Sequence, residues 1–99
     1  MGKLTDNDRS ARINAVSKNL KAGLEGKLGD NYLVIQVGLA QQTILDLNPQ
    51  LAALTADVIK NAINENSGMS KQQEYQLRAN VLLNVFRNMQ QENQIEIMK

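Results

Sequence analysis

The chain has 99 residues, a net charge of +1, three aromatic residues, no cysteine and no histidine. This length suits one domain with a modest core. The missing residue types exclude disulfides, thiolate nucleophiles, zinc or haem ligation and imidazole acid–base chemistry. Because the core must be aliphatic and the single proline leaves few turn signals, an all-α fold is favoured over a many-stranded one.

The first predicted helix spans about residues 8–26 and follows a disordered lead at 1–6. Asp6 and Asp8 can supply its N-cap and negative charge in its first turn. Its apolar residues form a narrow stripe at helical spacing: Ile13, Val16, Leu20 and Leu24. Each of the glycines at 23, 26 and 29 disfavours a helix interior by up to about 1 kcal/mol relative to alanine. We therefore expect this helix to pack loosely and to fray from about residue 23.

The second predicted helix spans about residues 31–47, with Asp30 or Asn31 as its cap. Its apolar residues alternate in steps of four and three: Leu33, Val37, Ala40, Ile44 and Leu47. The competing interpretation is a strand at Tyr32–Val37, where the β propensity is high. Helix is favoured because a single strand would find no partner elsewhere in the chain.

The third predicted helix spans about residues 49–66. Asn48 is placed to cap it, and Pro49 suits the first helical position, where a missing N–H is harmless. Its stripe consists of Leu51, Leu54, Val58, Ala62 and Ile63. Gly68 can take the left-handed conformation that often follows a helix.

The fourth predicted helix spans about residues 70–97 and is the longest. Ser70 and Gln73 have the spacing of a capping box. Its seam follows steps of four and three: Tyr75, Ala79, Leu82, Phe86 and Met89. At 1.5 Å per residue the helix is about 42 Å long, so shorter neighbours cannot cover all of it. We therefore predict partner contacts from these residues: Tyr75, Leu82, Phe86, Met89, Ile95, Ile97 and Met98.

Together these elements predict a small antiparallel four-helix domain with a long C-terminal helix. We expect the second, third and fourth helices to form the core. Leu82 and Phe86 should lie at its most buried point.

Charge is unevenly distributed, because residues 1–29 carry six basic and three acidic groups and residues 30–99 carry five and seven. The basic residues of the first helix could contact phosphate: Arg9, Arg12, Lys18 and Lys21. A nucleic-acid-binding regulator is therefore the alternative function. A solvated helix face explains the same charges.

Residues 50–68 resemble a helix-turn-helix of the phage-repressor kind. The resemblance rests on Leu51, Ala52 and Leu54 in its first helix and on Glu65, Asn66 and Gly68 at its end. Ala56 stands where that family has a turn glycine, and Val58 lies one position late. The resemblance implies DNA binding. An uninterrupted amphipathic helix is the competing interpretation.

The leading prediction for function is a non-enzymatic helical protein–protein interaction module, such as an adaptor, chaperone or regulator. It would form a homo-oligomer or clasp a partner helix. We expect no catalytic residue, cofactor, metal or small-molecule substrate, because carboxylates are sparse and no serine lies in a nucleophile motif. No signal peptide or membrane-length apolar run is evident, which favours a cytoplasmic protein without membrane insertion. Bacteriocin-immunity proteins share the expected architecture, but no motif here supports that family.

Overall fold

The computed structural model describes the backbone of residues 6–98 and the side chains of residues 8–91. It contains four helices, α1 (Asp6–Glu25), α2 (Asp30–Leu47), α3 (Pro49–Glu65) and α4 (Lys71–Met98). The predicted all-α class with four helices is confirmed, and every helix end lies within two residues of its predicted position. The lead predicted for residues 1–6 lies outside the described residues except for Asp6, where α1 begins.

Two predicted helix starts have the expected caps. The Asn48 side chain accepts a hydrogen bond from the Leu51 N–H at 3.1 Å, with Pro49 at the first helical position. At the start of α4 the Gln73 N–H donates to Ser70 Oγ at 3.1 Å, and the Ser70 N–H donates to Gln73 Oε1 at 2.9 Å. These caps satisfy backbone groups at the first turns of α3 and α4, so they fix the residues at which the two helices begin.

Other local predictions need correction. Asp6 and Asp30 both lie inside their helices and not before them. The residue preceding α2 is Gly29, with φ of 91°, and no side chain caps that end. A positive φ is accessible to glycine because it has no Cβ. The strand alternative at Tyr32–Val37 is wrong, since this segment is helical throughout.

The core confirms the predicted burial of Leu82 and Phe86, which are both 0% exposed. It also includes α1, because Ile13 and Leu20 are likewise 0% exposed. The expectation that the first helix packs loosely is therefore wrong. Gly23 is buried against α2, where a Cβ would lie only 3.3 Å from the Leu33 Cα, so this glycine allows the two helices to approach closely.

The loosely packed helix is α3 instead. Ile59 is its only buried hydrophobic residue, and Leu54 and Val58 are 62% and 54% exposed. Thr55 is also buried, and its hydroxyl donates to the Leu51 carbonyl at 2.7 Å. The prediction that α3 contributes a full stripe to the core is thus wrong.

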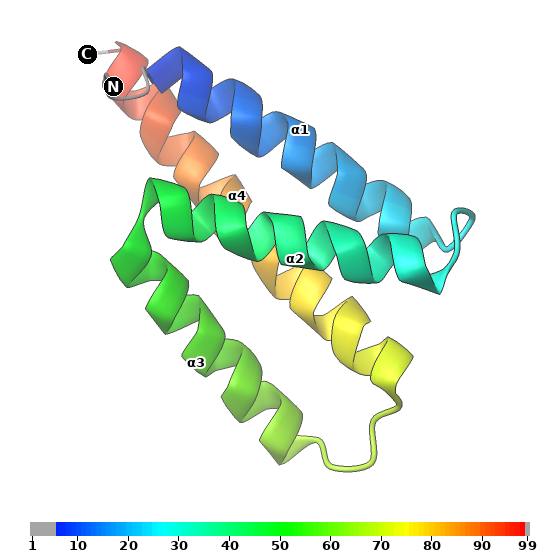
Figure 1. Cartoon of the computed structure of the whole chain (residues 1–99). Helices are drawn as coiled ribbons and strands as arrows, with labels where there is room; N and C mark the ends of the chain where they lie inside the picture. Colours follow the sequence, from blue (N-terminus) through cyan, green and yellow to red (C-terminus); the bar gives the residue numbers. More distant parts are fainter. Residues whose placement is uncertain (1–5, 99) are drawn as a thin grey trace.

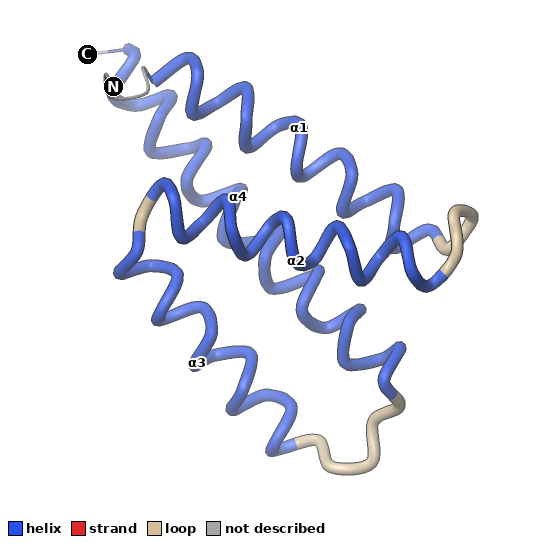
Figure 2. The backbone as a smooth tube through the Cα atoms, in the orientation of Figure 1, coloured by secondary structure: helices blue, strands red, loops and turns tan. Residues whose placement is uncertain are grey.

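Figure 1 shows the arrangement of helices that leaves α3 less buried than α1. Successive helices reverse direction, but α2 crosses in front of α4, so the helix axes are not all aligned as in a regular bundle. Helices α2 and α3 meet at Asn48 and then diverge from that corner. A single residue, Asn48, joins α2 to α3, and Figure 2 shows the short connection at this corner beside the longer loop between α3 and α4.

Candidate docking groove

Helix α2 is apolar on nearly all its sides. Leu33, Val37 and Ile44 are buried in the core. Further large apolar residues of the same helix are exposed: Val34, Ile35, Leu39 and Leu45. A helix with apolar residues all round is normally covered on all sides. In the described part of the chain, one side of α2 is left uncovered.

A hollow of about 400 Å³ opens beside this uncovered side. Its lining comes from α2, α3 and α4, and includes Gln41, Ile44, Leu45, Ala52, Ala53, Thr55, Ala56, Ile59 and Leu82. Eight of its ten lining residues are apolar, counting Pro49 at the corner. The divergence of α2 and α3 therefore leaves an apolar space with part of α4 as its floor.

A second hollow of about 290 Å³ continues the first along α3. The two share Gln41, Ala56 and Ile59, and the second extends to Asn64 and Arg78. We call the combined feature the α3 groove, lined by the residues of both hollows. From Pro49 to Asn64 it is about 22 Å long at 1.5 Å per residue, which is about four helical turns.

The two ends of the α3 groove differ in chemistry. Near Pro49 the lining carries no charged residue, and the Thr55 hydroxyl is already bonded to a backbone carbonyl. At the other end Lys60 projects from α3 and Arg78 from α4. The Arg78 guanidinium carbon lies 4.8 Å from the centre of the Tyr75 ring, a cation–π contact that restrains it. The groove is thus apolar near Pro49, whereas its other end combines Ile59 and Ile63 with polar and cationic side chains.

The partner-contact residues predicted on α4 lie mostly elsewhere. Phe86 and Met89 are buried within this chain, and α1 and α2 pack over them, so they are not available to a partner in this fold. Leu82 is fully buried but forms part of the groove floor, and Tyr75 is half-buried. The side chains of Ile95, Ile97 and Met98 lie outside the described ones, so their predicted contacts stay a prediction.

Sequence reasoning missed the outer face of α2 and the alanines of α3. The signal for α2 was present, because its apolar residues outnumber those needed for one stripe. The signal for Ala52, Ala53 and Ala56 was weak, since alanine is common in any helix. Their placement in the groove depends on the angle between α2 and α3 at Asn48, which is set by tertiary packing.

The four basic residues predicted to contact nucleic acid are not equivalent. Arg9 donates to the Leu47 carbonyl at 2.7 Å, and Arg12 forms an ion pair with Asp46 at 2.7 Å. The hydrogen bonds from Arg12 and then Gln42 lower the pKa of the Asp46 carboxyl, although partial burial acts in the opposite direction. Both arginines therefore hold α1 against the C-terminal end of α2.

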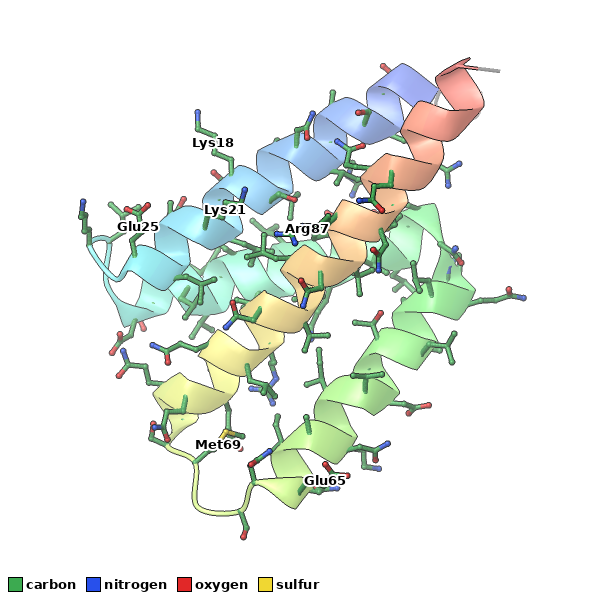
Figure 3. The ribbon with its side chains drawn as sticks, turned by 180° about the vertical axis from the view of Figure 1, so that it is seen from behind. Lys18, Lys21, Glu25, Glu65, Met69 and Arg87 are labelled. Atoms are coloured by element: carbon green, nitrogen blue, oxygen red, sulfur yellow. The ribbon has the colours of Figure 1, made fainter. Side chains whose placement is uncertain are left out.

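Lys18 and Lys21 remain on the surface, and both are exposed. Figure 3 shows Lys21 near Arg87 of α4, while Lys18 points away from the molecule. Lys21 and Arg87 both line a hollow of about 230 Å³, together with Asn14, Ser17, Leu83, Phe86 and Gln90. The Gln90 amide donates to Asn14 Oδ1 at 2.6 Å and to the Ser10 carbonyl at 3.1 Å. Nucleic-acid binding by this surface stays a prediction. Of the four predicted basic residues, it can draw on Lys18 and Lys21, because Arg9 and Arg12 are bonded to α2.

The helix-turn-helix interpretation is wrong, because α3 runs without a break from Pro49 to Glu65 and so contains no turn near Ala56. Among the described residues, no group of three or more histidine, cysteine, aspartate or glutamate side chains could hold a metal ion. None of the described helices has the length and apolarity to cross a membrane. No family model matches the sequence, and comparisons with curated proteins and with solved structures find no match.

Proposed function

We propose that the protein is a non-enzymatic protein–protein interaction module that binds an α-helical segment of another protein in the α3 groove. An adaptor, a chaperone or a regulator could each use such a site. The supporting observation is the groove itself, in which three helices present an apolar lining beside Leu45, which is 49% exposed. Uncovered apolar surface of this kind commonly marks an interaction site.

The shape of the α3 groove suits a helix. Its length of about 22 Å accommodates about 15 residues of partner helix. Ala52, Ala53 and Ala56 offer only methyl groups along one wall, so a partner backbone can approach closely. Ile44, Ile59 and Leu82 lie below as apolar contacts. A helix with apolar residues at i, i+3, i+4 and i+7 would bury one face there, as in other helix-in-groove complexes.

The proposal of a non-enzymatic role is supported by the polar groups of the groove. Thr55 carries the one hydroxyl group among the lining residues of both hollows, and it donates to the Leu51 carbonyl. Lys60 and Arg78 are the charged residues there, and neither lies in a nucleophile and base arrangement with another lining residue. The groove offers surface for binding and lacks the paired groups that general acid–base or covalent catalysis requires.

A matched pair of tryptophan variants tests the proposal. Ala56 is exposed and lines both hollows, whereas Asn61 is exposed on the same helix and lines neither. The probe is a fluorescent amphipathic peptide of about 16 residues, with leucines on one face and glutamines on the other. Fluorescence anisotropy should show saturable binding by the wild type and by Asn61→Trp, and little or none by Ala56→Trp.

Two results would contradict this function. One is the absence of saturable peptide binding together with a strictly monomeric protein in sedimentation from submicromolar to high micromolar concentration. The other is equal loss of binding in both tryptophan variants, which would show that the peptide does not occupy the groove. Circular dichroism of both variants establishes beforehand that each one retains its helices.

A further inference from the structure

The cations at the end of the α3 groove have no carboxylate partner among the residues whose side chains the structure describes. Within the described part of the chain, the ion pairs are Arg12 with Asp46 and Lys27 with Glu25. Lys60 and Arg78 belong to neither pair, and the lining of both hollows contains no acidic residue. This leaves two positive charges beside an open apolar surface.

Local carboxylates do not neutralise this end. In sequence, Asp57 precedes Lys60 by one helical turn and Glu74 precedes Arg78 by one, a spacing at which ion pairs commonly form. Neither pair forms here, and neither acid lines the groove. The Arg78 guanidinium lies over the Tyr75 ring instead, and this contact leaves its N–H groups free to donate.

From this charge pattern we infer that the helix bound in the α3 groove is an acidic amphipathic one. This inference rests on the function proposed above. The partner carries a four-turn apolar stripe, with aspartate or glutamate beside it at the end that meets Lys60 and Arg78. Guanidinium and carboxylate groups form short, charge-assisted hydrogen bonds, and Arg78 is already restrained in position for them.

A second copy of this chain fits less well than a separate acidic partner. Leu54 and Val58 are exposed on α3, but the larger exposed apolar face that a second copy would offer is that of α2, with four such residues. Its two carboxylates are engaged, since Asp46 pairs with Arg12 and Asp30 accepts a hydrogen bond from Gln72 at 3.2 Å. Helix α2 therefore supplies no free carboxylate for the cationic end of the groove.

Three peptides with the same leucine face test the inference. Their flanking positions carry glutamate, glutamine or lysine, and their affinities are measured by fluorescence anisotropy at low and high salt. The glutamate peptide should bind about five- to tenfold more tightly than the glutamine peptide, and the lysine peptide should bind most weakly. Added salt should reduce the difference between them, since it screens exposed charges.

Charge reversal in the protein should invert this order. The double variant Lys60→Glu/Arg78→Glu should prefer the lysine peptide, while Lys18→Glu/Lys21→Glu, with the same change in net charge on α1, should keep the wild-type order. Lys60 is exposed, so the single variant Lys60→Glu provides the same test, with a smaller shift, if the double variant does not fold.

Failure of the acidic-partner inference can be distinguished from failure of the proposed function. Equal affinity for the glutamate and glutamine peptides, or an equal shift in the α1 control, would overturn the acidic partner and leave groove binding intact. Binding of no peptide at all by a strictly monomeric protein would overturn the proposed function as well. A concentration-dependent dimer that is lost in Ala56→Trp would identify the occupant as a second copy and would also overturn the acidic partner.

Discussion

Helices α1 and α3 are both amphipathic and similar in length, with 20 and 17 residues, but they are packed very differently. On α1, Ile13 and Leu20 are completely buried, and Gly23 allows close contact with α2. On α3, Leu54 and Val58 are mostly exposed. The better separation of apolar and polar faces belongs to α3, so amphipathicity did not decide which helix packs tightly.

The comparison shows that the core is formed by one set of helices, α1, α2 and α4, whereas the proposed docking groove depends on α3. The central core cluster draws its buried residues from α1, α2 and α4. Helix α3 is attached at the Asn48 corner, through Leu51 and Ala52, which pack half-buried against this cluster, and through Ile59, and it forms one wall of the groove. A wall that is not needed for the core can be displaced or reshaped by a partner at little expense to the fold.

The largest expected effect comes from the core that α1, α2 and α4 share. Phe86→Ala should lower the free energy of unfolding by about 3–5 kcal/mol, because the ring is fully buried. A domain of this size has a total stability of about 5–15 kcal/mol, so the variant should melt far below the wild type or be largely unfolded. Urea denaturation measures the change. A loss below about 1 kcal/mol would mean that the core repacks without this ring.

A pair of leucine truncations compares the two helices directly. Leu20→Ala on α1 should reduce stability by about 3 kcal/mol, since that side chain is fully buried. Leu54→Ala on α3 should change it by no more than about 0.5 kcal/mol, because the residue is mostly exposed. Chemical denaturation of both variants gives the two values. Equal losses would contradict the assignment of α3 to the periphery.

Two glycine replacements sharpen the account of the contact between α1 and α2. In Gly23→Ala the new Cβ would lie 3.1 Å from Leu33 Cδ1 and 3.3 Å from the Leu33 Cα, so the helices must separate slightly. We expect a net loss of about 1 kcal/mol, since overpacking outweighs the gain in helix propensity. Gly38→Ala on α2 meets nothing within 4 Å and should gain about 0.5–1 kcal/mol. Thermal melts that show Gly23→Ala as stabilising would contradict close packing there.

The smallest effect concerns the ion pair between α1 and α2. Because Arg12 lowers the pKa of Asp46 in the folded protein, this carboxylate stabilises the fold at any pH above its ordinary, unfolded pKa. That stabilisation is lost as the pH falls through the folded pKa and Asp46 becomes protonated. The melting temperature of Asp46→Asn should therefore lie slightly below the wild type at pH 7, and the gap should close in acid. Asp57→Asn on α3 is the control and should show no such gap, since Asp57 forms no ion pair with any side chain that the structure describes.

Much of the fold was predictable because local signals and tertiary packing agree. The capping box at Ser70 and the Asn48 and Pro49 pair marked real helix starts. The seam of α4 correctly indicated that Leu82 and Phe86 are buried. The prediction of which helices cover α4 was wrong, because the core cluster contains α1 in place of α3. An apolar seam indicates that a helix face is covered and does not identify the helix that covers it.

The candidate site was harder to predict for the same reason. Helix propensity alone predicts that Gly23 is a weak point of the first helix, yet its missing Cβ is what allows α1 to pack against Leu33. Because α1 packs on the apolar seam of α4, α3 lies at the periphery of the core. Ala56 of α3 therefore lines an open groove. Neither residue carries a sequence signal for this role, since both depend on contacts between distant helices.

Amide hydrogen exchange, followed by NMR in the free protein and with the glutamate-flanked peptide, tests the central claim most directly. In the free protein, the amides of α3 should exchange faster than those in the middle of α1, α2 and α4, because few buried contacts hold α3 in place. Peptide binding should slow exchange in α3 and leave the centre of α1 nearly unchanged. Protection of α3 equal to that of α1 in the free protein, with no change on adding peptide, would contradict a loosely held wall and a docking site in the α3 groove.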